Sequence, residues 1–226
     1  MQFYPIEHHS WVAIDIHHNL GEQATLLTHK IRLTHKAAST NKAASAYKTG
    51  SMYCRQLLKK LQQALNLTGE LMDTNFPYHF ITADGYTWYV SFSHSRQHAA
   101  VLMSPYTNIG IDVEDSAISH HVASRFFSPH EYQWLNQKPA VNQAVLRNLL
   151  WRLKECAIKT HQNADKQLIK ELKHDVLDEW GEEVINQLIC IDEINDKDKP
   201  IQCVQTDAKI VGNFSSQPCS FIIVNS

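Results

Sequence analysis

The sequence predicts an α+β fold made of two halves, and three observations point to it. Segments typical of strands and helices follow one another as strand, helix, strands, and then strand, helices, strands. A break near residues 105–108, which read Pro-Tyr-Thr-Asn, falls close to the middle of the chain. The length of 226 residues suits one large domain or two small ones. We therefore expect halves at 1–107 and 108–226, packed tightly because no Gly/Ser-rich linker separates them.

In the first half, a short strand is expected at 11–16 and a long helix at about 40–65. The helix is predicted from apolar residues at helical spacing, which are Tyr47, Met52, Leu57, Leu58, Leu61 and Leu65. Its polar side is basic and carries Lys42, Lys48, Arg55, Lys59 and Lys60. Such a stripe is most often a solvated surface. Strands rich in aromatic and β-branched residues should follow at 78–82, 87–93 and 99–104, with a turn at Asp84-Gly85.

The second half is expected to open with a strand at 109–113 and to continue with helices. Ser128-Pro129-His130-Glu131 is typical of a helix start, because Ser caps, Pro fits the first turn and Glu131 completes a capping box. A longer helix is predicted at about 141–160, with a buried side made of Leu146, Leu149, Leu150, Leu153 and Ala157. From about Val184 onward the sequence predicts short strands, with the charged segment 192–199 as a loop between them.

The composition is that of an ordinary globular protein, with 43% hydrophobic and 19% charged residues. A formal net charge of −2 argues against a general nucleic-acid-binding protein, which needs a strong basic excess. No apolar run is long enough to cross a membrane, and residues 1–19 lack the pattern of a targeting segment. The five cysteines are irregularly spaced and form no Cys-x-x-Cys pair, which favours reduced thiols in a cytoplasmic protein.

Asp112 and Glu114 are the first candidates for a metal site. They lie two positions apart on a predicted strand, so their side chains share one face while Ile111 and Val113 face the core. Two carboxylates on one face repel each other unless a cation or a basic residue lies between them. Oxygen-only ligands suit Mg²⁺, which commonly binds one or two protein carboxylates together with water and phosphate oxygens. Solvated surface acids are the commoner explanation of this pattern taken alone.

Trp151, Glu155 and Lys159 are spaced four apart on the long predicted helix and share one face, with Lys154 beside them. A surface ion pair between Glu155 and Lys159, worth about 0.3–0.5 kcal/mol, explains this spacing without any chemistry. The alternative makes Glu155 a third metal ligand or a base, and Lys159 a phosphate contact. Trp151 is expected to pack and fix the helix, since an aromatic side chain on a helix face is more often core than ligand contact.

A cluster of small polar residues and a histidine, Ser91-Phe92-Ser93-His94-Ser95, ends the strand expected at 87–93. Its hydroxyls and imidazole could bind phosphate, although an ordinary loop cap has the same composition. Four motifs then follow in order: Ser93-His94-Ser95, Gly110-Ile111-Asp112-Val113-Glu114, Arg125-Phe126-Phe127-Ser128-Pro129-His130-Glu131 and Trp151-x-x-Lys154-Glu155-x-x-x-Lys159. Together they resemble the surfactin-type 4'-phosphopantetheinyl transferases, and the resemblance covers residues 91–159.

The resemblance implies a single-chain pseudo-dimer of two similar α+β halves, with coenzyme A bound in the cleft between them. Members of this family move 4'-phosphopantetheine from coenzyme A to a serine of an acyl, peptidyl or aryl carrier protein and release adenosine 3',5'-bisphosphate. We therefore expect a Mg²⁺-dependent transferase that acts on a carrier protein and is a monomer, because one chain already contains both halves of the cleft.

The resemblance also implies roles for the matching residues. The expected Mg²⁺ ligands are Asp112, Glu114 and Glu155, which would hold the ion against the coenzyme A pyrophosphate. The expected coenzyme A contacts are Lys48 (with Arg55 as the alternative), Ser93, His94, Lys154 and Lys159. Glu155 is also the expected base, and Lys159 the group that stabilises the leaving phosphate. Glu131 is left out of the catalytic set, because its capping box explains it without chemistry.

The chain departs from the family in the segment before the Ser-His-Ser strand. Relatives often carry a Lys-Pro pair there, whereas this chain reads Asp84-Gly85-Tyr86-Thr87-Trp88. This departure motivates a second hypothesis, a relative that binds a carrier protein or coenzyme A without transfer. A third hypothesis is an unrelated Mg²⁺-dependent phosphohydrolase, which would explain Asp112 and Glu114 but not the ordered motifs.

Overall fold

The computed structural model describes residues 1–6, 10–16, 42–160, 175–189, 201–206, 209–214 and 218–224. The predicted α+β class is confirmed, because helices pack on two antiparallel sheets. The first sheet has the order β1-β2-β5-β4-β3, with β1 (Gln2–Ile6), β2 (Ser10–Ile16), β3 (His79–Ile81), β4 (Thr87–His94) and β5 (His98–Ser104). The second sheet has the order β6-β9-β8-β7, with β6 (Asn108–Val113), β7 (Ile201–Gln205), β8 (Lys209–Phe214) and β9 (Cys219–Val224).

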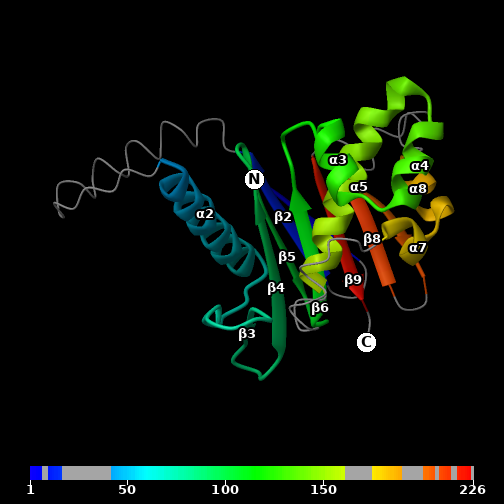
Figure 1. Ribbon diagram of the computed structural model, residues 1–226. Helices are drawn as coiled ribbons and strands as arrows, with labels where there is room; N and C mark the ends of the chain where they lie inside the picture. Colours follow the sequence, from blue (N-terminus) through cyan, green and yellow to red (C-terminus); the bar gives the residue numbers. More distant parts are fainter. Residues whose placement is uncertain are drawn as a thin grey trace.

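The elements form four layers, with the two sheets in the middle (Figure 1). Helix α2 (Lys42–Ala64) covers the outer face of the first sheet through Cys54, Leu57, Leu58 and Leu61. The outer face of the second sheet is covered by α3 (His120–Phe126), α4 (Pro129–Gln137), α5 (Ala140–Thr160), α7 (Val176–Trp180) and α8 (Glu182–Ile189). Between the sheets lies a shared core of apolar side chains from both halves, including Val12, Leu102, Ile111 and Phe221.

The two halves repeat one connectivity. In each half a strand (β2 or β6) leads into helix, and a meander of three strands follows (β3-β4-β5 or β7-β8-β9). The last strand of each meander pairs antiparallel with the first strand of its half, β5 with β2 and β9 with β6. This repeat supports the expectation of two similar halves. A symmetric pseudo-dimer and a domain boundary at residue 107 stay predictions, since the sheets share one core.

Most predicted elements are present within one or two residues of their expected ends. The turn at Asp84-Gly85 is confirmed, with Gly85 at φ +86° and a backbone hydrogen bond from Thr82 N to Tyr86 O of 2.9 Å. Strand β1 and helix α3 were not predicted. The expected strand near Val184 is wrong, because residues 182–189 form α8, whose Ile185 and Leu188 are buried at helical spacing. The expected loop at 192–199 lies outside the described residues.

The two sheets are joined where β4 passes the outer edge of β6. Strand β6 is the last strand of its sheet, so the N–H groups of Ile111 and Val113 point away from β9. The hydroxyl oxygens of Ser91 and Ser93 on β4 accept these two N–H groups, each at 3.2 Å. Both serines are buried, and a buried N–H left without an acceptor costs about 1–3 kcal/mol. The polar residues at the end of β4 therefore fix the position of one half against the other.

Helix α5 lies against β6 at a position where no side chain fits. A Cβ atom on Gly110 would be 2.1 Å from the carbonyl oxygen of Cys156 in the α5 backbone. Glycine is thus required for the close approach rather than for an unusual backbone conformation. The contact brings the side chains of α5 that follow Cys156 next to those of β6.

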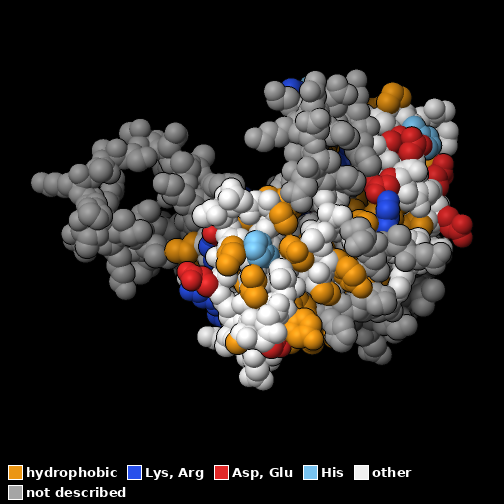
Figure 2. Space-filling view, turned by 90° about the horizontal axis from the view of Figure 1, so that it is seen from below, with side chains coloured by type: hydrophobic (Ala, Val, Ile, Leu, Met, Phe, Trp, Pro, Cys, Tyr) orange, Lys and Arg blue, Asp and Glu red, His pale blue; other side chains and the backbone are white. Residues whose placement is uncertain are grey.

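No helix among the described residues is long and apolar enough to cross a membrane. The β3–β4 end of the molecule exposes three large apolar side chains, Met72, Ile81 and Tyr86. Figure 2, which views the molecule from below, shows apolar side chains on this face in separate groups rather than in one continuous patch.

Gly110→Ala should destabilise the fold strongly, by about 3 kcal/mol or more, because the methyl group overlaps backbone atoms that cannot move independently. The measurement is the free energy of unfolding in urea. Gly85→Ala is the matched control, because nothing lies within 4 Å of its added Cβ and only the left-handed backbone is strained, at a cost of about 1–2 kcal/mol. An equal or smaller loss for Gly110→Ala would contradict the close contact between α5 and β6.

Candidate functional site

A cleft of about 440 Å³ lies between the two halves. Its walls come from α2, the segment before β3, β4, β6 and α5. The lining residues are Ser51, Cys54, Arg55, Phe76, Tyr78, Ser91, Phe92, Ser93, His94, Asp112 and Lys159. The first half thus supplies a wall of aromatic and small polar side chains, and the second half supplies a carboxylate and an ammonium. Of the residues expected from sequence to form the site, Ser93, His94, Asp112 and Lys159 meet here.

Asp112 is the central side chain of this group. Its Oδ1 atom accepts a hydrogen bond from the Ser93 hydroxyl at 2.8 Å and from the Lys159 ammonium at 2.9 Å. The same ammonium donates to the carbonyl oxygen of Ile111 at 2.7 Å, on the outer edge of β6. Asp112 is buried and Lys159 is largely buried, so this ion pair is shielded from solvent. One residue from the first half and one from α5 of the second half therefore converge on a single carboxylate.

The charges in the cleft perturb one another. Burial raises the pKa of Glu155, the charges of Asp112 and Glu114 raise it further, and only Lys159 opposes them. Burial alone would lower the pKa of Lys159, but Asp112 and other neighbouring groups raise it above its ordinary value. Burial and the charge of Lys159 lower the pKa of His94, which favours a neutral imidazole. The cleft therefore contains a protonated amine and a neutral ring. Glu155 and Glu114 are not among its lining residues, but Glu155 is electrostatically coupled to Asp112 and Lys159, which are.

The three carboxylates suit Mg²⁺ by the chemistry of their donors, which are all oxygens. Asp112 lies on β6 and Glu114 directly follows the end of this strand, and the charges of both raise the pKa of Glu155 on α5. Their ligand atoms do not gather within 4.8 Å of one another, however, and Lys159 supplies the nearest positive charge to Asp112. Glu114 also accepts a hydrogen bond from Ser116 N at 2.8 Å. The arrangement is a carboxylate cluster with its own internal counter-ion.

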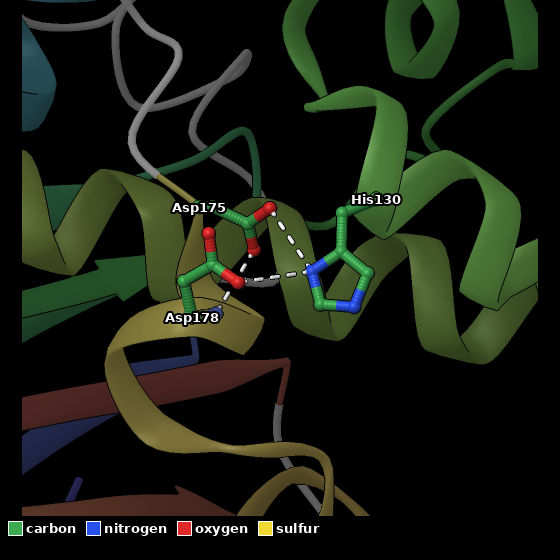
Figure 3. A group of neighbouring side chains, drawn as sticks. All are labelled: His130, Asp175 and Asp178. Carbon is green, nitrogen blue, oxygen red and sulfur yellow. Dashed lines mark hydrogen bonds and ion pairs between the residues drawn. The ribbon is translucent and has the colours of Figure 1, made fainter.

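A tighter group of potential ligands lies elsewhere, at the N-terminal ends of α4 and α7. The His130 Nδ1 atom is 3.3 Å from Asp175 and 3.1 Å from Asp178 (Figure 3). The Asp175 carboxylate already caps α7 by accepting from Leu177 N and Asp178 N, and it also accepts from the Ser128 hydroxyl. Its capping bonds and the His130 contacts explain this cluster as a link between two helix starts.

Lys154 has a different place from the one that the resemblance implied. Its ammonium is buried and donates to both carboxylate oxygens of Glu131, at 2.9 and 2.7 Å. The same carboxylate completes the capping box with Ser128 N and accepts from Val176 N, each at 2.8 Å. The structure therefore does not bring Lys154 into the cleft. It joins α5 to the first turns of α4 and α7.

Only some of the residues that the first half contributes to the cleft were predicted from the sequence. Arg55, named as the alternative to Lys48, lines the cleft, with its guanidinium 5.7 Å from the Phe92 ring centre and 2.6 Å from the Asp73 carboxylate. Lys48 falls in α2, and its side chain is outside the part of the chain that the structure describes. Phe76 and Tyr78 were not predicted as site residues, because they belong to no motif and no spacing rule places them in the lining of the cleft.

Glycine and cysteine on α2 shape the wall beside His94. A Cβ atom on Gly50 would lie 2.6–2.8 Å from atoms of the His94 ring, so only glycine leaves room for the imidazole in its present position. One turn later, the Cys54 thiol donates to the carbonyl oxygen of Ser93 at 3.2 Å. Burial raises the pKa of Cys54 to about 11, so the thiol keeps its proton at neutral pH. Gly50 and Cys54 thus affect the positions of His94 and Ser93, and neither was predicted from the sequence as a site residue.

The second half of the chain matches a known family. Residues 108–207 match the sequence model of the 4'-phosphopantetheinyl transferase superfamily. The matched range is less than half of the chain and contains Asp112, Glu114, Glu155 and Lys159, while Ser93 and His94 precede it. The match supports this superfamily and phosphopantetheine transfer in general. It does not separate the surfactin-type members from the others. No curated protein matches the chain.

Lys154→Met should lower the free energy of unfolding by about 3–5 kcal/mol, because it leaves the Glu131 carboxylate buried without its counter-charge. Urea unfolding followed by circular dichroism measures this loss. Lys159→Met is the comparison and should cost less, since the Lys159 side chain is 19% exposed whereas that of Lys154 is 2% exposed. A loss for Lys154→Met no larger than that for Lys159→Met would contradict the structural role of Lys154.

The ionised Asp175 cap should make the stability of the protein depend on pH in the acid range. Burial alone would raise the pKa of Asp175, but the Ser128 hydroxyl, backbone N–H groups and His130 lower it overall. The stabilisation is therefore complete above an unfolded pKa of about 3.9 and is lost as the pH falls through the lower folded value. The difference in unfolding free energy between wild type and Asp175→Asn should shrink on going from about pH 6 to about pH 3. A difference that stays constant over this range would contradict the ionised cap.

Proposed function

We propose that this protein is a Mg²⁺-dependent 4'-phosphopantetheinyl transferase of the surfactin type. Its substrates would be coenzyme A and the apo form of an acyl, peptidyl or aryl carrier protein, and it would act as a cytoplasmic monomer. The observation that carries the proposal is the cleft itself. It brings Ser93, which lies before the matched range, into a hydrogen bond of 2.8 Å with Asp112, which lies inside it, and its lining also includes His94 from before the range and Lys159 from within it.

Coenzyme A is an anionic ligand with a pyrophosphate at its centre, and the cleft offers groups that suit it. Lys159 from the second half and Arg55 from the first half place positive charge in the lining. Ser93 and His94 add a hydroxyl and an imidazole to the same lining. The aromatic side chains Phe76, Tyr78 and Phe92 form an apolar stretch of the first-half wall that suits the less polar parts of the ligand. Lys48 stays a prediction as a further phosphate contact.

The transfer itself needs a proton acceptor and a stabilised leaving group. The carrier serine Oγ attacks the β-phosphorus of coenzyme A, and the bond from that phosphorus to the oxygen bridging the two phosphates breaks. Adenosine 3',5'-bisphosphate leaves with the bridging oxygen, and the serine proton passes to Glu155. The raised pKa of Glu155 suits this role, because a carboxylate with higher proton affinity is the better base.

The positive groups act on the charge that develops on the leaving phosphate. Lys159 is held by Asp112 and by the carbonyl oxygen of Ile111 on β6, which places its ammonium in the lining of the cleft, where it would face a phosphate oxygen. Asp112, Glu114 and Glu155 would hold Mg²⁺, which supplies charge neutralisation at the pyrophosphate when it is bound. Glu155 has no hydrogen-bond or ion-pair partner in the described part of the chain, which leaves its carboxylate available for either role.

The second candidate function is binding of coenzyme A or a carrier protein without transfer. Two observations favour it: the ligand atoms of Asp112, Glu114 and Glu155 are not gathered as in a preformed metal site, and Asp112 is already paired with Lys159. The raised pKa of Glu155 favours the transferase instead, since a group held only for packing has no need of like-charged neighbours.

The test is intact-mass spectrometry of apo-carrier proteins incubated with this protein, coenzyme A and Mg²⁺. We expect the carrier to gain one phosphopantetheine mass, and the gain to disappear with EDTA. Glu155→Gln should slow transfer by about 10²–10⁴-fold while the fold is kept, since it removes the proposed base. Glu183→Gln on α8 is the matched control and should keep full activity, because Glu183 is exposed and, unlike Glu155, is not coupled to Asp112 and Lys159.

The outcomes separate the hypotheses. No labelling of carriers from several pathways, together with measurable coenzyme A binding, would favour the binding-only relative. Consumption of coenzyme A in the absence of a carrier would favour a phosphohydrolase. Full activity of Glu155→Gln would contradict the assignment of the base.

A further inference from the structure

Asp115, which follows β6 directly after Glu114, makes a set of contacts that the proposed chemistry does not use. Its Oδ2 atom accepts from the Ser95 hydroxyl at 2.5 Å and from Gln97 N at 2.6 Å. Its Oδ1 atom faces the Nδ1 atom of His98 in a short contact. All three partners belong to the first half, while Asp115 belongs to the second. One carboxylate therefore holds a turn that lies on the other side of the junction between the halves.

The turn that Asp115 holds is the connection between β4 and β5. It is closed by a hydrogen bond from Ser95 N to His98 O of 2.8 Å, and His98 N also donates to the Ser95 hydroxyl at 3.3 Å. The next pair along the ladder joins His94 to Ala99, so the turn begins directly after the cleft residues Ser93 and His94. Any movement of the turn is therefore transmitted to these two side chains.

Burial gives the contact its strength. The side chains of Asp115 and His98 are each only 11% exposed. The interaction is thus shielded from water, and the hydrogen bonds to an ionised carboxylate are stronger than those between neutral groups. At the other end of the same two-strand junction, Ser93 bonds to Val113 N and to Asp112. Ser93 and Asp115 together fix β4 to β6 on both sides of His94.

We propose that Asp115 is a positioning residue, which holds the β4–β5 turn against the end of β6 and thereby sets the distance between Ser93 and His94 on one wall of the cleft and Asp112 on the other. The consequence for binding rests on the proposed function, in which both walls contact coenzyme A. Without Asp115 the two walls are joined on one side of His94 only, and coenzyme A meets a cleft of variable width.

The experiment compares Asp115→Ala with Asp175→Ala. Asp175 is a close match, because its side chain is also 11% exposed and also contacts a histidine, a serine hydroxyl and backbone N–H groups, but it lies outside the cleft. We expect Asp115→Ala to weaken coenzyme A affinity and to lower kcat/KM for coenzyme A by about 10- to 100-fold, as loss of a supporting contact commonly does. Asp175→Ala should leave both quantities within about twofold of wild type.

Asp115→Asn is the conservative variant and should recover much of the loss, because its amide oxygen can still accept from the Ser95 hydroxyl and Gln97 N. If Asp115→Ala does not fold, Asp115→Asn provides the test of the positioning role instead. Wild-type affinity and kcat/KM in a folded Asp115→Ala would overturn the proposal, and so would an equal loss in Asp175→Ala.

A readout that does not involve coenzyme A keeps this proposal separate from the proposed function. The side-chain resonances of His94, assigned with His94→Gln, should shift in Asp115→Ala and stay in place in Asp175→Ala. If wild type neither binds coenzyme A nor labels a carrier, the proposed function fails while the His94 shift still decides the positioning role. Unchanged His94 resonances in Asp115→Ala would overturn it.

Discussion

Two serine hydroxyls on β4 hold the halves of this protein together, and the cleft depends on them. An edge strand such as β6 has outer N–H groups that ordinarily face solvent or another strand. Here the hydroxyls of Ser91 and Ser93 accept hydrogen bonds from these N–H groups inside the protein. This allows the face of one sheet to pack against the edge of the other. Because Ser93 also donates to Asp112, the contact that joins the sheets is itself part of the candidate site. The same side chain therefore stabilises both the contact between the two sheets and the candidate site.

Helix α5 supplies the remaining side chains, and it is fixed at three places. Gly110 admits it to backbone contact with β6, and the buried pair of Lys154 and Glu131 ties it to α4 and α7. The Arg152 guanidinium is buried against Ser220 and Asn213, at 3.1 Å from each, on the two strands beyond β6. Lys159 extends from this helix into the cleft, and Glu155 lies four positions before it. The position of the helix is thus set by packing that reaches across the second sheet, which gives the site rigid support.

Much of the fold was predictable because its signals are local. The capping box at Ser128, the turn at Gly85 and the apolar spacing of α2 and α5 each act within a few residues. Helix α8 was missed because its apolar residues, rich in Val and Ile, also suit a strand and only the packed core decides between them. Motif order predicted that Ser93, His94, Asp112 and Lys159 would meet. It could not separate the roles of Lys154 and Lys159. They lie five positions apart, which is about 140° around the helix, and the burial of Lys154 depends on where Glu131 lies.

The pairing of Lys159 with Asp112 has a consequence for any cation or anion that enters the cleft. The site already contains a positive charge of its own, so a metal ion at Asp112 would compete with the ammonium of Lys159 for the same carboxylate. Binding of a cation there would be an exchange of one cation for another. Its free energy would depend on the difference between two hydrated cations rather than on the full cost of bringing one out of water.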